Sequence, residues 1–578
     1  MARWLGWVGR ARRAGVVSTM LALAALLGSA CGDDAIVADD AAADVLTADT
    51  APDVAADTLV TPDTSDTADT TVVDTADTSV VDTRDTADTA DTRDTTPPGD
   101  DAADATQPGH CTSPFVYLRD GQLWRGDAPF VPVSVNYIFD IRHTPEDDYY
   151  IAPHSSFCDT PSGCCDTRET CLAAARAQLA QIAAMGVNSL RVVGLAVVPE
   201  DGTVVLDCAH QWPDWLDYCP KSAHLVMDPP DPRGLALIDD ALALVAEAGL
   251  NAVFLAGHHA LDADGVKDRY AAYLTTLAGH LADDPTVFAY DLMNEPVYEL
   301  EQRDIDKLSA HAIGRAWYDA VRAGSRRAMV TWGLAELGAV EHWDPGVLPM
   351  DFVSWHIYGS GRWTADVRDY LSMFLAWPRT QPLPWLVGET GLSVEDGGPS
   401  EYEQSLFAQH ALDTTWACGG MGLQWWLYRD TYWGPTGRGF GLVRRSDGAE
   451  RPAAEVFRDF TPTWPRPACP APAYSGSAPD GTFLTTGRLV REDGSPVAGG
   501  FVSGHKCFTG GYDWTLSRAD GTFELRSTGA IAELSVTAPG LSREGAAVLC
   551  GAVQPGDITL KALPLDMRTS APSSCPAP

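Results

Sequence analysis

Two glutamates, Glu295 and Glu389, are the residues in this sequence best placed to do chemistry. Each stands at the end of a short apolar run. Glu295 directly follows the run Val287–Asn294, and Glu389 is the last residue of the run Leu386–Glu389. Two carboxyl groups that face each other can cleave a glycosidic bond, since one protonates the leaving oxygen while the other attacks the sugar or activates water. The pair therefore predicts glycosidic cleavage.

Other polar and aromatic residues stand at corresponding places and suit the same chemistry. They supply a cation, an amide, two imidazoles, a phenol and an indole: Arg191, Asn294, His258, His356, Tyr358 and Trp425. His259 is an alternative to His258, and Trp426 is an alternative to Trp425. An aromatic face can support a sugar ring. Adjacent histidines point apart and no third ligand accompanies them, so we expect neither a metal nor another cofactor.

These residues are positioned by short apolar runs that alternate with longer helical patterns between residues 111 and 460. The eight expected strands are Phe130–Asn136, Ser189–Val193, Asn251–Ala256, Val287–Asn294, Ala328–Thr331, Phe352–His356, Leu386–Glu389 and Gly422–Trp426. Apolar residues recur at helical spacing between them, as in Cys171–Met185, Leu235–Ala248 and Tyr402–Trp416. Such alternation predicts an α/β fold, a closed (β/α)8 TIM barrel whose chemistry lies at the carboxyl ends of the strands. A doubly wound sheet is disfavoured, because no Gly-rich phosphate loop follows the first strand.

Three motifs in this region resemble hallmarks of glycoside hydrolase family 5, the cellulase and mannanase family. They are Asp291–Pro296, Trp355–Tyr358 and Val387–Glu389, and the segments Met185–Arg191 and Val133–Asn136 are similar too. The resemblance covers roughly residues 112–460 and includes all eight expected strands in order. It does not rest on a single tripeptide.

The resemblance implies a retaining mechanism with two glutamates. Glu295 would be the acid/base and Glu389 the nucleophile. Arg191 would keep Glu389 ionised by charge pairing, and Tyr358 would orient it. The substrate would be a β-1,4-linked polysaccharide, either glucan or mannan.

The same resemblance implies roles for the remaining residues around the sugar. Asn294 would hold the sugar 2-hydroxyl, and His356 would modulate Glu295. His258 would touch the reacting sugar, and Trp425 would form the floor of its subsite.

Residues 1–30 are typical of an export signal, because arginines precede an apolar run, Val16–Leu27, that is too short to span a bilayer comfortably. Leu27–Cys31 resembles a bacterial lipoprotein signal, which implies a lipid on Cys31 that holds the protein to a membrane. Ordinary cleavage after Ala30 is the alternative. We therefore expect a bacterial outer-membrane or cell-surface lipoprotein, or otherwise a secreted protein.

Residues 31–110 form a low-complexity tract of Ala, Asp, Thr and Val. The chain has a formal net charge of −39, and residues 32–110 hold 21 Asp against two Arg. Such a segment buries too little apolar surface to offset its ordering entropy, so we expect a disordered stalk. The Asp spacing is irregular and lacks the glycines that calcium-binding repeats use, which disfavours such a repeat. A polyanion repels phosphate backbones, so nucleic acid is excluded as a partner.

The pattern changes after the expected barrel at 111–460. Residues 461–481 are rich in Pro, Ala and Ser and predict a linker, and 564–578 form a tail. Residues 482–563 show short alternating strands with turn signals, which predict a small all-β sandwich domain. This segment resembles the carboxypeptidase regulatory-like domain.

The number of cysteines is consistent with an exported protein. The chain has 13 Cys, and setting aside Cys31 as a lipid carrier leaves an even number, which suggests disulfides. Cys507 and Cys550 share the C-terminal β segment and could be bridged across it.

Two functions of different classes fit these observations. The first is a monomeric glycoside hydrolase, surface-anchored or secreted, that binds and cuts polysaccharide outside the cell. The second is a catalytically weak surface receptor that uses the barrel to capture polysaccharide. Glu295 and Glu389 favour the enzyme, because a receptor needs neither.

Overall fold

A computed structural model describes the part of the chain that follows the expected stalk. The described residues are 111–144, 148–154, 157, 165–196, 204–207, 224–257, 266–298, 305–359, 361–378, 381, 383–394, 398–431, 438–471, 476–507, 511–548, 550 and 555–565. The predicted signal, stalk and lipidation site Cys31 lie outside them, as do residues 566–578 of the predicted tail and His258 and His259. Within the described residues no helix is long and apolar enough to cross a membrane.

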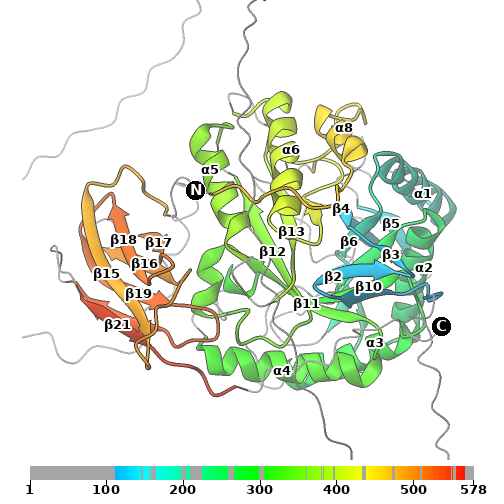
Figure 1. Ribbon diagram of the computed structural model, residues 1–578. Coiled ribbons are helices and arrows are strands. Elements are labelled where there is room, and N and C mark those ends of the chain that lie inside the picture. The colour runs from blue at the N-terminus through cyan, green and yellow to red at the C-terminus, as the bar shows by residue number, and fades with distance from the viewer. Residues whose placement is uncertain are drawn as a thin grey trace, which may run out of the picture. The chain divides into compact units, whose positions relative to one another are not determined.

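Eight parallel strands form a closed barrel (Figure 1). In chain order they are β4 (Val133–His143), β6 (Ser189–Val193), β9 (Asn251–Leu255), β10 (Val287–Asn294), β11 (Met329–Ala335), β12 (Val353–Tyr358), β13 (Trp385–Gly391) and β14 (Leu423–Trp425). Each strand pairs with the next, and β14 returns to β4 in the register Leu423 to Val133 and Trp425 to Val135. The predicted (β/α)8 barrel is confirmed. An additional strand, β5 (Tyr149–Pro153), pairs antiparallel with β4.

Helices connect most of these strands. They are α1 (Arg168–Ala184), α2 (Pro232–Glu247), α3 (Val266–His280), α4 (Lys307–Gly324), α5 (Ala365–Ala376), α6 (Glu401–Ala417) and α8 (Pro452–Asp459), with the 3-10 helices η3 (Pro296–Tyr298) and η4 (Leu337–Glu341). Among the described residues, the connection from β11 to β12 contains only η4.

Local sequence fixes the helices that follow β10 and β13. At the start of α6, Ser400 Oγ accepts the N–H of Glu403 at 3.2 Å, and the Glu403 carboxylate accepts the N–H of Ser400 at 2.8 Å. This reciprocal capping box satisfies two otherwise unpaired N–H groups. Asp306 caps α4 by accepting the N–H groups of Leu308 and Ser309, each at 3.0 Å. Both helices therefore begin at defined residues.

A small sheet closes the amino-terminal end of the barrel. Its strands are β1 (Val116–Arg119), β2 (Gln122–Arg125) and β3 (Ala128–Pro129). Apolar residues of this sheet and of the loop after it share one buried cluster with residues at the beginnings of the barrel strands: Val116, Leu123, Phe130, Phe288, Met329, Phe352 and Leu386. Arg191, His356 and Glu389 lie towards the opposite, carboxyl-terminal end.

A β domain follows the barrel. Its strands are β15 (Phe483–Arg491), β16 (Phe501–Lys506), β17 (Tyr512–Leu516), β18 (Thr522–Ser527), β19 (Ile531–Thr537), β20 (Glu544–Ala547) and β21 (Asp557–Leu560). They form one sheet in the order β18-β15-β21 and another in the order β17-β16-β19-β20. Both sheets contribute to one hydrophobic core, which includes Leu489 and Phe523 from the first and Val502 and Leu534 from the second.

Disulfides occur in both domains. Those in which both cysteines are among the described residues join Cys165 to Cys171, Cys418 to Cys469, and Cys507 to Cys550. The last is the bridge expected within the β domain. The second ties the segment predicted as a linker to the end of α6.

The β domain contacts the barrel through a buried cation. Lys307 Nζ, at the start of α4, lies 2.7 Å from Asp344 Oδ2 and donates to Thr537 Oγ1 at 2.6 Å and to the Leu541 carbonyl at 2.8 Å. Burial is the largest effect on this ammonium group and lowers the pKa of Lys307, against the opposing attraction of Asp344. One side chain therefore bonds to both domains.

Candidate active site

The carboxyl ends of four barrel strands bring most of the predicted site residues together. Arg191 lies on β6, Asn294 ends β10, His356 and Tyr358 end β12, and Glu389 lies on β13. Glu295 follows β10 directly. These residues come from positions far apart in the chain, and parallel strands place their carboxyl ends at one face of the barrel.

The two glutamates have different surroundings. The Glu295 side chain is 20% exposed, whereas the Glu389 side chain is 7% exposed. An oxygen of Glu295, a nitrogen of His356 and an oxygen of Glu389 all lie within 4.8 Å of one another. Glu295 has a φ of 44°, which is uncommon for a residue with a side chain, and its N–H donates to the Gly333 carbonyl at 2.8 Å. Strained backbone of this kind often occurs at functional sites.

Arg191 is the centre of a buried network. Its Nη1 donates to Glu389 Oε1 at 2.5 Å and to Asn136 Oδ1 at 3.0 Å. Its Nε donates to Asp291 Oδ2 and its Nη2 to Asn294 Oδ1, both at 2.9 Å. Burial alone would lower the pKa of this guanidinium, but the charges of Asp291 and Glu389 outweigh burial and raise it. Arg191 is therefore a permanent cation beside Glu389.

Asp291 and Asn136 are site residues that the sequence argument did not assign. Asp291 is fully buried, and besides holding Arg191 it accepts the N–H of Gly333 at 2.8 Å. Asn136 Nδ2 donates to the carbonyls of Gly388 and Trp425, at 3.3 and 3.2 Å. Both residues fix the direction of the guanidinium. Asn136 lies in the segment Val133–Asn136 and Asp291 in the motif Asp291–Pro296, and this position was the sequence signal that could have identified them.

Tyr358 holds the second oxygen of Glu389. Its hydroxyl donates to Glu389 Oε2 at 2.6 Å. Burial and then the negative charge of Glu389 raise the pKa of Tyr358 far above its ordinary value, so the hydroxyl keeps its proton. Each oxygen of Glu389 therefore has a fixed donor, and these donors stabilise the ionised carboxylate.

His356 lies between the glutamates. Its Nδ1 is 2.8 Å from Glu295 Oε1 and 3.7 Å from Glu389 Oε2. Burial lowers the pKa of His356 to about 4. The imidazole is consequently neutral at neutral pH, so it adds no positive charge that would pull the proton from Glu295.

Two glycines leave room for the His356 ring. A Cβ added to Gly333 would lie 2.9 Å from both Cε1 and Nε2 of His356. A Cβ added to Gly388 would lie 3.1 Å from Nε2 and only 1.8 Å from Ser354 Oγ. Larger residues at these positions would displace the imidazole.

Glu295, His356 and Glu389 have the donor types of a metal site. The charges around Glu389 disfavour a metal ion at this position. Arg191 and Tyr358 already donate to its two oxygens, and a divalent cation there would be repelled by the buried guanidinium. The arrangement fits a carboxylate that attacks carbon better than one that ligates a metal.

Trp425 is not positioned as predicted. Its side chain is fully buried and packs edge-on against Phe407 of α6 and Phe457 of α8, and its indole N–H donates to the Phe440 carbonyl at 2.8 Å. This ring faces the helical layer, so the assignment of Trp425 as a sugar floor is wrong. Successive strand residues point to opposite faces, which leaves Trp426 as the alternative. The predicted sugar contact of His258 lies outside the described residues.

Comparison with known proteins agrees with this site. Residues 164–426 match the family model described as Cellulase (glycosyl hydrolase family 5). The matched segment spans seven of the eight barrel strands and contains Arg191, Glu295 and Glu389. Over this segment the barrel is therefore similar to a glycoside hydrolase domain of family 5. No curated protein matches the chain.

Several solved structures are similar to this chain at low identity. One is the exo-beta-1,4-mannosidase Op5Man5 from Opitutaceae bacterium strain TAV5, at 17% identity and a TM-score of 0.42, covering 60% of this chain and 61% of that one. The chain thus spans less than two thirds of that protein. Another is GH5_18 from Streptomyces cattleya in complex with GlcNAc, at 19% identity and a TM-score of 0.39, covering 62% and 85%.

Proposed function

We propose that this protein is a retaining glycoside hydrolase that cleaves β-1,4-linked polysaccharide outside the cell. One observation carries the proposal: a carboxylate oxygen of Glu295 lies within 4.8 Å of one of Glu389. Retaining enzymes hold their carboxyl groups about 5–5.5 Å apart, whereas inverting enzymes separate them by about 6.5–9.5 Å to admit a water. The separation here favours direct attack by Glu389.

In the first step, Glu389 attacks the anomeric carbon and forms a glycosyl ester. Arg191 and Tyr358 keep its carboxylate ionised and aimed. Glu295 is the more exposed of the two carboxyl groups, and it gives its proton to the leaving oxygen as the glycosidic bond breaks. The neutral His356 beside Glu295 makes it easier for that carboxyl to hold a proton.

In the second step, Glu295 acts as a base. It takes a proton from water, the water oxygen attacks the anomeric carbon, and the ester bond to Glu389 breaks. Two inversions give net retention at that carbon, and both carboxyl groups return to their starting states. Asn294, held by Arg191 at 2.9 Å, is suited to bind the sugar 2-hydroxyl.

The substrate and location extend the proposal. The substrate is glucan or mannan, and Trp426 replaces Trp425 as the sugar floor. A lipid on Cys31 and the acidic stalk hold the domains away from a bacterial membrane. These parts rest on the sequence patterns in residues 1–110 and on the motifs of the barrel.

The test is reducing-end release from carboxymethylcellulose, lichenan, xyloglucan, xylan and galactomannan by purified residues 111–578 made in an oxidising host. Glu295→Gln should lower activity by about 10²–10⁴-fold, and Glu389→Gln by at least as much. Glu455→Gln, on the exposed side of α8, is the matched control and should be as active as wild type. Wild-type activity in either folded active-site variant would overturn the proposal.

A further inference from the structure

Phe440, in the chain between β14 and α8, packs against the residue that holds the nucleophile. Its ring lies edge-on to the ring of Tyr358, with the ring centroids 5.8 Å apart. Tyr358 is the last residue of β12, and its hydroxyl donates to Glu389 Oε2 at 2.6 Å. The strand therefore fixes the backbone of Tyr358, and Phe440 supports the ring that carries the hydroxyl.

Phe440 also packs onto the strand that carries the nucleophile. A Cβ added to Gly391, the last residue of β13, would lie 2.8 Å from Cδ1 of Phe440 and 2.6 Å from the carbonyl oxygen of Trp426. A side chain at Gly391 would therefore push the ring away, because closely packed atoms leave no spare volume. Gly391 is two residues after Glu389 on β13. The ring of Phe440 thus lies against the carboxyl ends of both β12 and β13.

Hydrogen bonds hold the backbone before Phe440. The Gly439 carbonyl accepts from Nε2 of Gln404 on α6 at 2.9 Å and from the N–H of Val394 at 3.0 Å. Gly439 has a φ of 73°, and a Cβ on it would lie 2.1 Å from the Val394 carbonyl oxygen, so only glycine fits here. The carbonyl of Phe440 itself accepts the indole N–H of Trp425 at 2.8 Å. The chain therefore reaches Phe440 along a fixed path.

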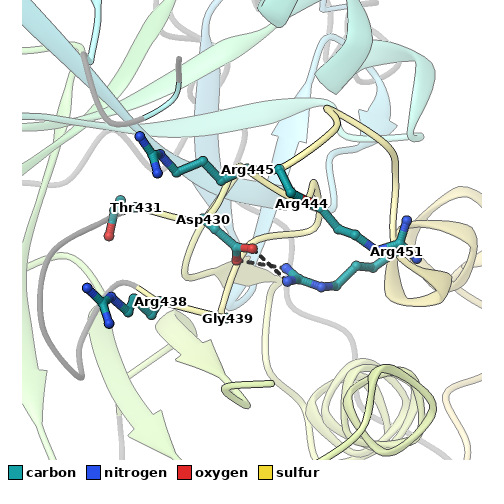
Figure 2. A pocket seen from close by; sticks show the side chains of 8 residues that line it. Asp430, Thr431, Arg438, Gly439, Arg444, Arg445 and Arg451 are labelled. Atoms are coloured by element: carbon teal, nitrogen blue, oxygen red, sulfur yellow. Dashed lines mark hydrogen bonds and ion pairs between the residues drawn. The ribbon is translucent and has the colours of Figure 1, made fainter. Parts of the chain in front are cut away.

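A buried ion pair holds the backbone after Phe440. Figure 2 shows the guanidinium of Arg451 facing the carboxylate of Asp430, and the two hydrogen bonds between them are 2.7 and 2.6 Å long. The Gly441 N–H donates to Asp430 Oδ1 at 2.8 Å, and the Gly441 carbonyl accepts from Arg451 Nη1 at 2.6 Å. A bidentate pair of this kind fixes the geometry of both partners. The pair therefore sets the position of Gly441 and of the ring one residue before it.

We propose that Phe440 is a positioning residue for the nucleophile and that the pair of Asp430 and Arg451 holds Phe440 in place. Phe440 acts through Tyr358, because an edge-on contact favours one orientation of the neighbouring ring. In that orientation the Tyr358 hydroxyl reaches Glu389 Oε2. A small misplacement of a reacting group slows the chemical step steeply. This inference rests on the proposed function, in which Glu389 attacks the anomeric carbon.

The kinetic test is a double-mutant cycle. Phe440→Ala should lower kcat by about tenfold and leave KM near the wild-type value, because the lost support acts on the attacking group. In a Tyr358→Phe background the same substitution should cost less than about twofold, since the hydroxyl through which Phe440 acts is already absent. Phe440→Tyr keeps a ring at this position and should retain most of the activity. Phe483→Ala, on β15 with 47% of the residue exposed, is the matched control and should change neither background. Equal losses from Phe440→Ala in both backgrounds overturn the proposal.

A structural test needs no turnover and separates this inference from the proposed function. Crystal structures of the wild type, Phe440→Ala and Arg451→Lys compare the distance from the Tyr358 hydroxyl to Glu389 Oε2, which is 2.6 Å here. Arg451→Lys keeps the charge but loses the two-pronged fork, so Gly441 and the ring before it should shift. In both variants the hydroxyl should move beyond hydrogen-bond distance, about 3.5 Å.

A hydrogen bond that persists at the wild-type length in both variants overturns the proposal, even where the wild type cleaves every polymer offered. Loss of the bond in both variants supports it, and in that case a wild type that cleaves no polymer contradicts only the proposed function. Loss of the bond in Phe440→Ala alone supports the ring contact and overturns the part assigned to the ion pair.

Discussion

Nδ1 of His356 lies 2.8 Å from Oε1 of Glu295, in a place where the imidazole is fully buried. Burial keeps this ring neutral by lowering the pKa of His356 to about 4. Glu389, by contrast, accepts hydrogen bonds from Arg191 and Tyr358. Two carboxyl groups in one site thus have opposite surroundings, one suited to holding a proton and the other to staying ionised.

The first prediction concerns the Tyr358 hydroxyl, which donates a hydrogen bond to Glu389. Tyr358→Phe removes the donor to Oε2 and keeps the ring against Phe440. We expect kcat/KM to fall by about 10- to 100-fold.

Steady-state kinetics of the variant and the wild type check this. Tyr402→Phe, on α6 with 68% of the residue exposed, is the matched control. A kcat/KM at the wild-type level in folded Tyr358→Phe would show that the hydroxyl does not support the carboxylate.

The second prediction concerns Asp291. Asp291→Asn keeps the shape but removes the charge that faces Arg191 at 2.8 Å. We expect kcat to fall by about 100-fold, since the guanidinium that aims Glu389 loses its anchor. Unfolding stability should fall by about 3 kcal/mol, because a buried cation loses a partner.

Asp351→Asn is the control that separates folding from function. Asp351 is also buried and pairs with Arg322, away from the glutamates, and accepts the N–H of Val330 at 2.7 Å. This variant should lose comparable stability while kcat at a permissive temperature stays near the wild-type value. Equal losses of kcat in both variants would mean that Asp291 has only a structural role.

The third prediction concerns stability against pH. The neutral form of His356 is favoured in the folded protein, whereas the unfolded chain takes up the proton near pH 6.5. The unfolded state therefore binds more protons between about pH 6.5 and 4, and stability falls as pH falls through that window. This one group accounts for about 3 kcal/mol across the window.

Urea unfolding at pH 7 and pH 4.5 measures this loss. In His356→Gln the loss between the two pH values should be smaller than in wild type by about 2 kcal/mol. The same loss in both proteins would contradict a neutral, buried imidazole.

The fourth prediction concerns chelation. Both oxygens of Glu389 are held by donors of this chain, and Arg191 lies beside them. Activity should therefore survive dialysis against EDTA without change. A loss that is restored by a divalent ion would assign Glu295, His356 and Glu389 to a metal instead.

The sequence predicted the barrel because its strands are short buried runs separated by helical spacing, and each predicted run overlaps one strand. It was harder to predict which of Trp425 and Trp426 faces the sugar, because a shift of one residue moves a side chain to the other face of a strand. Trp425 thus faces α6 and α8, whereas motif spacing had favoured it over Trp426.

Long-range pairing was the other part that the sequence did not reveal. Asp291 and Arg191 are 100 residues apart, and only closure of the barrel brings them together. The ion pair between Arg444 and Glu401 was missed for a similar reason. The arginines after β14 show no periodicity in the chain, and Glu401 comes from the helix before β14.

The most direct test of the account is to trap the glycosyl ester. A 2-deoxy-2-fluoro glycoside with a dinitrophenyl leaving group forms the ester quickly and hydrolyses it slowly, because fluorine destabilises both transition states. Intact mass followed by peptide mapping should show one sugar per chain, attached to Glu389, and Glu389→Gln should take up none. A sugar on another residue, or an active enzyme that forms no adduct and inverts the anomeric carbon, would contradict the account.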